Sequence, residues 1–501
     1  MDFESTNLRR RTVSGVSWSA VAQLVTQCFS WVISIIVARL VGPRAYGLIA
    51  MTAVFSGFAM LFSDLGLSAA IIQRANLEKR HLDTAFWINM ASGLLMTALM
   101  AGLAPVIAAF YREPRLTWIT IIAALQFTLV SINVVEQALI RREMRFRALA
   151  GIQITSTVIG GTVALGMAFA GMGVWSLVAQ PLCSTSIRVL LFWTVAQWRP
   201  SLSFDTQAGK ELFGFSGYVL GSYIVQYWAR NADNLLVGRL IGAQALGIYS
   251  RAYTMMLLPL NQITTVVSGV MAPALCSIQH DRVRVKRSYL RAVRILSLIT
   301  FPMMTGLFVT SEQLILVLLG RQWLEVVPIF KILCGVGLLQ SITGTVGWIY
   351  HSQGRTALMF KMAVIGSLGG IVAFIVGIRW GVLGVAWAYC IFCLIWWYPV
   401  WATCGSIIGL SFSKMVKTLL PSFFCATTMG CMVWGIGRVL PTAMPAWECL
   451  LVQVPSGLVI YALLVLGFRL QAGREAAIAL RELLSRPVVA TKRPTAAAYT
   501  F

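Results

Sequence analysis

Charged and metal-binding residues are scarce in this 501-residue sequence. Only 11% of the residues are charged, and aspartate and glutamate together number 17. Because a soluble globular chain carries roughly 25% charged residues, this composition excludes a soluble fold. The sequence contains three histidines, and their spacing is not that of metal ligands. We therefore expect no metal site.

Catalytic and redox signatures are also missing. The sequence contains no glycine-rich loop of the P-loop type and no Ser/His/Asp set. Its ten cysteines lie mostly in apolar segments and lack the spacing of a secreted disulfide-bonded domain. Cys390 and Cys393 form a CxxC pair, but in a Trp-rich apolar helix this pattern indicates packing. The sequence predicts neither catalytic residues nor a cofactor.

Apolar residues, in contrast, are abundant and come in long blocks. They make up 58% of the chain, and the mean hydropathy is +0.79. The blocks reach the roughly 20 residues that a helix needs to cross a bilayer, and they lack the alternation of a membrane barrel. We expect an all-α polytopic membrane protein with about 14 transmembrane helices, at 13–40, 46–72, 84–110, 116–140, 148–169, 173–197, 212–241, 247–278, 289–311, 326–350, 357–378, 381–408, 415–437 and 447–468.

The net charge of +23 has two interpretations. A nucleic-acid partner is one, and the enrichment of Lys and Arg in cytoplasmic loops is the other. Most of the basic residues fall in segments that share one side of the predicted topology, while the opposite turns are short and poor in charge. The second interpretation is therefore favoured. It predicts membrane lipids as neighbours, no nucleic acid, and both termini in the cytoplasm.

One segment recurs 200 positions later. Residues 37–48 match residues 237–248, with Val, Arg, Leu, Gly, Ala and Gly identical. The offset covers six predicted helices, so the two copies have the same orientation in the membrane. We expect two parallel six-helix lobes plus two C-terminal helices, arranged as a cytoplasmic N-terminus (1–12), an N-lobe (13–197), a cytoplasmic linker (198–211), a C-lobe (212–408), two extra helices (415–468) and a basic cytoplasmic tail (469–501).

An unusual polar cluster precedes the second copy. Arg230, Asn231, Asp233 and Asn234 lie in an otherwise apolar span, where ionisable groups are costly. On a helix, positions 230, 233 and 234 share a face. An internal Arg230–Asp233 pair is one interpretation. The other is a cavity-lining cluster in which Arg230 attracts an anion and Asp233 binds a cation or proton. The equivalent positions of the first copy are Ser30, Trp31, Ile33 and Ser34, so the cluster is not duplicated.

Four further residues are candidates. Arg39 and Arg239 each precede a Leu-Val/Ile-Gly turn, so they either cap a helix C-terminus, where cations are favoured, or contact the substrate. Arg251 opens span 8 and is a second candidate for anion binding. Asp64, in span 2, is a candidate ion-coupling carboxylate. Any energy source would be an ion gradient or the substrate gradient, since no nucleotide site is present.

Several motifs together resemble the Wzx-type polysaccharide-biosynthesis flippases of the multidrug/oligosaccharidyl-lipid/polysaccharide exporter superfamily. The resemblance extends from about residue 12 to about residue 410, and its motifs lie at 62–74, 139–146, 173–175, 231–253, 319–328 and 381–388. It implies a two-lobed fold with a central cavity and alternating access. It also implies an undecaprenyl-pyrophosphate-linked oligosaccharide as substrate, carried across the bacterial inner membrane for exopolysaccharide, capsule or O-antigen assembly.

Two alternatives remain open at this point. A drug/cation antiporter on the same fold is disfavoured by the scarcity of intramembrane carboxylates. A membrane polymerase or ligase of the polysaccharide pathway would need a sizeable extracytoplasmic loop, and the predicted outer turns are short. A polymerase and chain-length or export proteins of the pathway are further candidate partners.

Overall fold

The computed structural model describes residues 2–60, 67–73, 77–206, 217–441, 443–471, 473 and 475. Its regular elements, over that part of the chain, are all helical. They are α1 (Asp2–Val41), α2 (Pro43–Met60), α3 (Leu67–Gln73), α4 (Lys79–Tyr111), α5 (Leu116–Ile132), α6 (Val134–Arg142), α7 (Phe146–Phe169), α8 (Val174–Val195), α10 (Gly217–Leu240), α11 (Ala243–Ser277), α12 (Arg282–Val309), α13 (Ser311–Leu318), η1 (Arg321–Trp323), α14 (Val326–Thr343), α15 (Val346–Ser352), α16 (Thr356–Gly377), η2 (Ile378–Trp380), α17 (Gly381–Ile408), α18 (Phe412–Val439) and α19 (Ala446–Gly467).

The expected all-α membrane architecture is confirmed. Within the described residues, 11 stretches are long and apolar enough to cross a membrane. The stretch Thr356–Ile408 covers two expected spans, because it joins α16 and α17. The expected spans at 46–72 and 212–241 are not among the 11, and each lies partly outside the described residues. The count of fourteen therefore stays a prediction.

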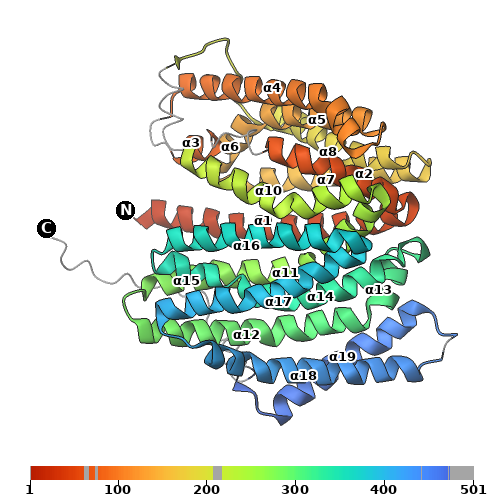
Figure 1. The fold of residues 1–501 in the computed structure, drawn as a ribbon. Coiled ribbons are helices and arrows are strands. Elements are labelled where there is room, and N and C mark those ends of the chain that lie inside the picture. The colour runs from red at the N-terminus through yellow and green to blue at the C-terminus, as the bar shows by residue number, and fades with distance from the viewer. Residues whose placement is uncertain are drawn as a thin grey trace. The chain divides into compact units, whose positions relative to one another are not determined.

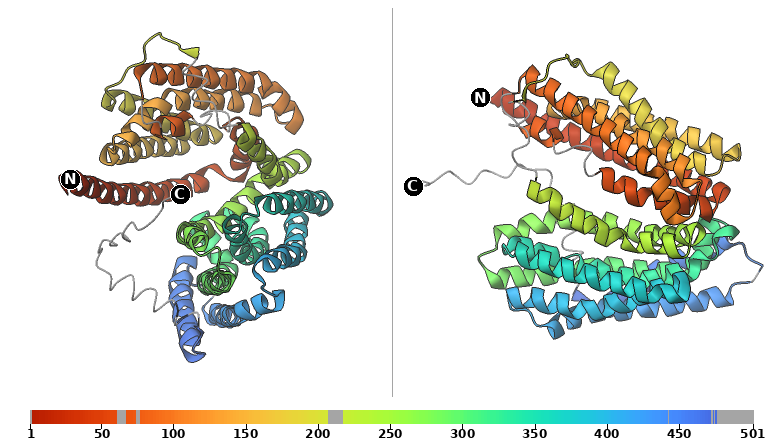
Figure 2. Two further views of the ribbon diagram at one scale, coloured as in Figure 1. Left: turned by 90° about the vertical axis from the view of Figure 1, so that its left-hand side faces the viewer. Right: turned by 45° about the horizontal axis from the view of Figure 1, so that its top comes forward.

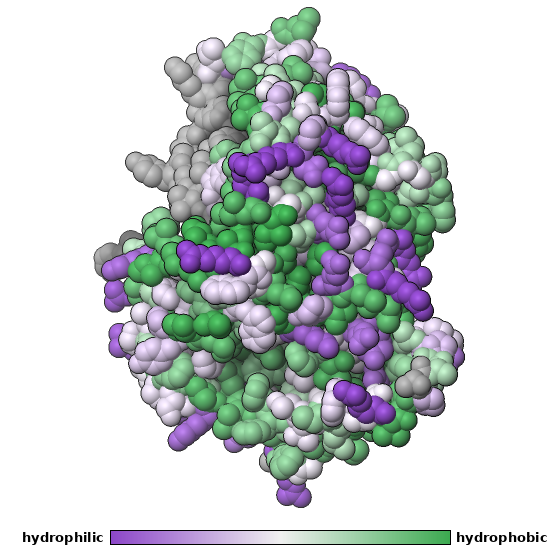
Figure 3. Space-filling view, turned by 45° about the vertical axis from the view of Figure 1, so that its right-hand side comes forward, coloured by the Kyte–Doolittle hydropathy of each residue, from purple (hydrophilic) through white to green (hydrophobic). Residues whose placement is uncertain are grey.

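Apolar side chains cover much of the molecular face drawn in Figure 3, and hydrophilic residues are gathered there into separate groups. Many large apolar residues are exposed, among them Leu190, Val266 and Leu458. In water such a surface would be strongly unfavourable, but lipid tails are as apolar as these side chains. The exposed apolar surface is therefore that of a membrane-integral protein.

Two boundaries differ from the sequence expectation. The inner loop expected at 279–288 is shorter, because α12 begins at Arg282, where the Asp281 carboxylate accepts the N–H groups of Val283 and Arg284. This N-cap satisfies two of the first free N–H groups of the helix. The turn expected at 311–325 contains α13 and η1, which the sequence alone did not separate from a loop.

The two copies of the repeat turn in the same way. Gly42 follows α1 with φ +80°, and Gly242 follows α10 with φ +115°. Both lie in the left-handed region that glycine adopts without the steric cost of a Cβ. Each glycine lets the chain leave one helix and enter the next within a single residue or two, so the repeated Leu-Val/Ile-Gly sequence encodes a tight helical turn.

The helices form two packing units, which we describe separately. The first comprises residues 1–255, 311–333 and 361–392, and the second comprises 256–310, 334–360 and 393–501. In the first unit, α4 lies along α5 and α7 lies along α8 and α1 (Figures 1 and 2). In the second, α18 packs between α12 and α19. The lobe and domain boundaries expected from the repeat stay a prediction.

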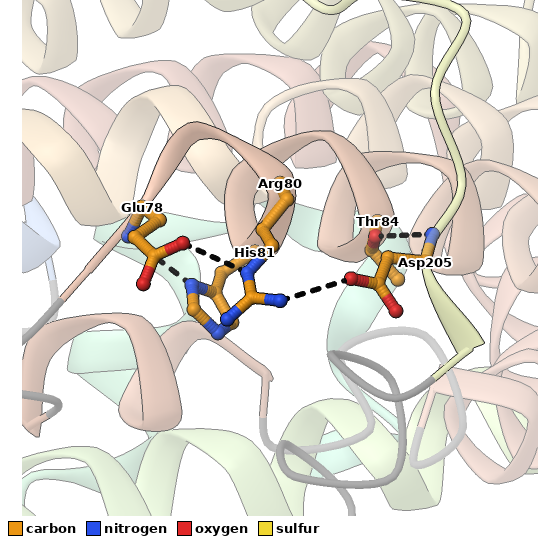
Figure 4. A network of polar contacts seen from close by, with 5 residues as sticks. All are labelled: Glu78, Arg80, His81, Thr84 and Asp205. Atoms are coloured by element: carbon orange, nitrogen blue, oxygen red, sulfur yellow. Dashed lines mark hydrogen bonds and ion pairs between the residues drawn. The ribbon is translucent and has the colours of Figure 1, made fainter.

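The segment after α8 is tied to the beginning of α4. The buried Asp83 carboxylate accepts the backbone N–H of Ser201 at 3.1 Å, the Ser201 hydroxyl, and the Ser203 hydroxyl at 3.0 Å. Figure 4 shows the adjoining contacts: the N–H of Asp205 donates to Thr84 Oγ1, and the Asp205 carboxylate pairs with Arg80 at 3.3 Å. Residues 201–205 of the expected linker are thus held against the start of α4.

Candidate functional site

The two copies of the repeat pack directly against each other. A Cβ built on Gly47 would lie 1.6 Å from the carbonyl oxygen of Ala243, and one on Gly247 would lie 1.9 Å from that of Pro43. Ala243 and Pro43 occupy equivalent positions of the repeat. The first turns of α2 and α11 therefore cross at backbone contact, and the contact is reciprocal. No side chain fits at either glycine.

Arg39 reaches from the first copy to a helix of the second half. Its guanidinium donates to the carbonyl oxygen of Leu318 at 3.1 Å and to that of Val317. Nearby, the Trp323 indole N–H donates to the carbonyl oxygen of Ala38 at 2.9 Å. Arg39 thus satisfies free carbonyls at the C-terminus of α13, where a cation is also favoured by the helix dipole.

Arg239 makes the corresponding contact in the opposite direction. Its guanidinium donates to the carbonyl oxygen of Phe110, at the end of α4, and lies 5.2 Å from the centre of the Phe110 ring. Arg239 caps α4, the third predicted span, and Arg39 caps α13, the short helix that follows the third predicted span of the second half. Both end near a residue with positive φ, Gly320 and Arg112. The geometry thus favours capping over substrate contact, but each arginine caps a helix of the opposite half.

Asp233 is buried, with 5% of its surface exposed, and is held by a tyrosine of α11. The Tyr249 hydroxyl donates to Asp233 Oδ2 at 3.1 Å, and the N–H of Asn234 donates to Oδ1 at 2.7 Å. Arg230 is exposed and forms no ion pair with Asp233. The structure therefore separates the members of the predicted cluster: the carboxylate faces the protein interior, and the guanidinium does not accompany it.

The Asn231 side chain forms a hydrogen bond within its own helix, because its amide donates to the carbonyl oxygen of Tyr227 at 2.9 Å. Tyr227 in turn joins α10 to α2, because its hydroxyl donates to the carbonyl oxygen of Val54 at 2.7 Å. Asp64, the other predicted coupling carboxylate, lies outside the described residues. The described residues contain no group of three or more His, Cys, Asp or Glu side chains placed to hold a metal ion.

Arg251 crosses from the second copy to the first. Two of its guanidinium nitrogens donate to Ser34 Oγ at 3.2 Å, and its charge lies 5.2 Å from the centre of the Tyr46 ring. Its Nε is buried and has no hydrogen-bond partner. None of the described carboxylates forms an ion pair with it. A guanidinium with only neutral partners retains uncompensated positive charge, which suits it to an anion with several oxygens.

Sequence reasoning missed one buried carboxylate. Glu136 lies within the expected span 116–140 and is 1% exposed. The signal was available, because an ionisable residue inside an apolar span is a functional candidate by default. Its position just before Arg141 and Arg142 makes it look like part of a charged loop.

Comparisons with known proteins show to which family the chain belongs. The model of a family described as "Polysaccharide biosynthesis protein" matches residues 36–328, more than half of the chain. The chain belongs to this family. The resemblance to Wzx-type polysaccharide flippases is confirmed, and the match includes the repeat, Asp233 and Arg251.

Two curated proteins are similar over most of the chain. The teichuronic acid biosynthesis protein TuaB of Bacillus subtilis (strain 168) is 28% identical over 464 residues, which cover 92% of this chain and 96% of TuaB. The lipopolysaccharide biosynthesis protein WzxC of Escherichia coli (strain K12) is 24% identical over 438 residues, 87% of this chain and 89% of WzxC.

A solved structure shows which fold this family member has. The lipid II flippase MurJ, in an inward closed conformation, superposes with a TM-score of 0.69 at 16% identity, covering 94% of this chain and 100% of that one. At this identity the similarity establishes the fold. The superposition therefore agrees with the expected all-α membrane fold.

Proposed function

We propose that this family member is a flippase that moves undecaprenyl-pyrophosphate-linked oligosaccharide repeat units across the bacterial inner membrane by alternating access. The product would supply exopolysaccharide, capsule or O-antigen assembly. The observation that carries the proposal is the family match together with two relatives named for teichuronic acid and lipopolysaccharide biosynthesis. Both polymers are built from sugars, and the chain itself has no catalytic constellation that the sequence reveals.

The reciprocal contacts of the repeat support the alternating-access part of the proposal. In a transporter of two similar halves, access changes when contacts between the halves form on one side and break on the other. Gly47, Gly247, Arg39 and Arg239 provide such contacts at the turns of the repeat, which the basic-residue distribution assigns to the extracytoplasmic side. In the proposed orientation, with both termini cytoplasmic, these contacts would close the outer side.

Arg251 is the residue that we assign to the pyrophosphate. Pyrophosphate oxygens match the planar guanidinium in two-point contacts, and the neutral partners of Arg251 leave its charge available. Asp233 is assigned to ion coupling, since its carboxylate is buried against Tyr249 and could bind a cation. Arg230, Asn231 and Asn234 remain proposed contacts of the substrate pathway, and Asp64 remains a proposed coupling residue. Arg39 and Arg239 are assigned to the closed state.

The experiment that tests the function uses a deletion strain. Lipid-linked repeat units are expected to accumulate on the cytoplasmic leaflet, where they stay inaccessible to a membrane-impermeant sugar-modifying probe until the cells are lysed. Units that reach the periplasm but stay unpolymerised would overturn the flippase assignment and point to a polymerase. Unchanged polymer together with increased drug sensitivity would instead point to an antiporter.

The site assignment is tested by complementing the same strain. Asp233→Ala and Arg230→Ala are each expected to abolish polymer export while the folded protein stays at normal abundance in the membrane. Normal export by both variants at normal abundance removes these residues from the site. Complementation by the wild-type chain is the positive control.

A further inference from the structure

A short stretch of non-helical chain lies along one face of α4. It consists of residues 200–205, which follow α8, and we call it the strap. The strap runs beside the first turns of α4 (Figure 1). Its hydrogen bonds reach four positions of that helix, namely Arg80, Asp83, Thr84 and Trp87. Because these positions are three or four residues apart, they form a single face of α4.

The polar side chains of the strap contact α4. The Ser201 and Ser203 hydroxyls donate to the Asp83 carboxylate, which belongs to a residue only 1% exposed. The Asp205 carboxylate pairs with Arg80 at 3.3 Å. The polar groups on this face of α4 are therefore satisfied by the strap, as buried polar groups in proteins generally are.

The apolar side chains of the strap point away from α4. Leu202 and Phe204 alternate with the serines, and in extended chain successive side chains point to opposite sides. Leu202 is 94% exposed and Phe204 is 59% exposed. Exposure of two large apolar side chains to water is unfavourable, so the nature of this surface depends on what surrounds it.

The face of α4 that the strap covers becomes an exposed apolar stripe farther along the helix. The stripe continues at helical spacing with Ala91, Leu94, Leu95 and Ala98. All four residues are exposed, Leu94 by 53% and Leu95 by 59%. Because α4 is long and apolar enough to cross a membrane, such a stripe faces lipid tails. The strap therefore lies on the lipid-facing side of α4.

The strap lies at the level of the membrane interface. α4 has 33 residues, whereas roughly 20 are enough to cross the hydrocarbon layer. From Trp87, which donates to the strap, to Tyr111 at the far end of the helix, the rise is about 36 Å. The hydrocarbon layer is about 30 Å thick, so the first turns of α4 reach the headgroup layer.

We propose that Leu202 and Phe204 insert into the lipid interface beside the start of α4, so that the strap is a lipid-binding surface. Its inner side chains pair with the polar face of α4, and its outer side chains extend the apolar stripe that faces lipid. Charged and polar groups of α4 that lipid would otherwise contact are thereby covered, and such groups are costly in a membrane. The strap also ties the chain after α8 to the leaflet in which α4 begins.

The test measures what surrounds the strap in the full-length chain in lipid nanodiscs. Single cysteines replace Leu202 or Phe204 in a cysteine-free background and carry a bimane fluorophore. Quenching by nitroxide-labelled lipids is compared with quenching by iodide in the water phase. Leu202→Cys and Phe204→Cys are both expected to be quenched by the nitroxide lipids and to be largely protected from iodide.

Two further cysteine variants define the limits of this measurement. Leu94→Cys is the lipid control, because Leu94 lies on the exposed apolar stripe of α4. His280→Cys is the water control, because His280 is exposed in the turn between α11 and α12. Strap labels that behave like His280→Cys overturn the proposal. Strap labels shielded from both quenchers indicate a protein contact, such as a second copy of the chain, and overturn it as well.

A photo-cross-linker at Phe204 keeps the test decisive if the cysteine-free chain does not fold. Benzoylphenylalanine takes the place of Phe204 in the otherwise unchanged chain, which is illuminated in native membranes. Lipid adducts found by mass spectrometry support the proposal, and the same group at His280 should give none. Adducts with a second copy or another protein, without lipid adducts, overturn it. Neither experiment involves substrate, so the flippase assignment is unaffected by the outcome.

Discussion

Gly47 and Gly247, 200 positions apart in the chain, each touch the backbone of the other's helix. A Cβ on Gly47 would meet the carbonyl oxygen of Ala243, and a Cβ on Gly247 would meet that of Pro43. The two copies of the repeat are therefore self-complementary about a local two-fold relationship. The duplicated segment therefore provides the surface through which its two copies contact each other.

Gly47→Ala and Gly247→Ala are expected to weaken this closure. An added methyl group meets backbone atoms that cannot rotate away, and such overpacking costs about 1–3 kcal/mol. In a cysteine-free background, Leu246→Cys is buried in the closed state and should react slowly with a membrane-impermeant maleimide. Either alanine substitution should speed that reaction.

The matched control for these two variants is Gly102→Ala, because a Cβ at Gly102 meets nothing within 4 Å. The control should leave the maleimide reaction at Leu246→Cys unchanged. Equal reaction rates in all three glycine variants and in the parent chain would show that the contact does not limit access.

The hydrogen bond between Tyr249 and Asp233 predicts an energetic coupling between the two side chains. A hydrogen bond to a charged group contributes about 1.5–3 kcal/mol, and removing one partner leaves the other buried and unsatisfied. Asp233→Ala and Tyr249→Phe should therefore each lower the unfolding midpoint, and the double variant should lose less than the sum. Additive losses in thermal unfolding would contradict a direct bond.

Polymer export should fall even when Arg251 is replaced by lysine. Its two nitrogens converge on Ser34, and the guanidinium lies over the Tyr46 ring, a geometry that an ammonium group does not reproduce. We expect Arg251→Lys and Arg251→Ala both to lower polymer export at normal protein abundance, by about tenfold or more if one charge-assisted phosphate contact is lost.

Arg44→Ala provides the control for the Arg251 variants. Arg44 also belongs to the repeat but is 58% exposed and pairs with Glu113 at 3.1 Å. An exposed ion pair contributes about 0–1 kcal/mol, so this variant should export normally. Equal export by the Arg251 and Arg44 variants would remove Arg251 from the proposed site.

Asp83 is predicted to hold the linker. Asp83→Ala removes the acceptor of three hydrogen bonds from Ser201 and Ser203, and should release the segment after α8 from α4. Limited proteolysis of this segment should then be faster than in the wild-type chain. Asp205→Asn weakens only a partly exposed ion pair and should have a smaller effect.

The sequence predicted the class of fold and much of its detail. Apolar runs of bilayer length can only be satisfied as helices, because every backbone N–H and C=O has to be paired within the chain. The expected span 381–408 agrees with α17 to the residue, and the Leu-Val/Ile-Gly pattern marked both turns of the repeat correctly. Helix capping by Arg39 and Arg239 was one of the two interpretations that their positions before the Leu-Val/Ile-Gly turns suggested.

The roles of individual polar residues were less predictable. Helical spacing placed Arg230 and Asp233 on one face. Spacing within one helix does not show which side chains of a neighbouring helix lie opposite that face. Tyr249 bonds to Asp233, and Arg230 stays exposed. Glu136 was overlooked because its burial depends on the helices packed around α6, which the sequence of the span does not reveal.

By itself, then, the sequence determined that this chain is a helical membrane protein with a duplicated turn, since local hydropathy and backbone pairing decide those features. Only the tertiary structure decided that Arg39 and Arg239 cap helices of opposite halves, that Asp233 pairs with Tyr249, and that Arg251 meets Ser34 and Tyr46. These are contacts between residues far apart in the chain, and they depend on the register and crossing of packed helices, which no local pattern encodes.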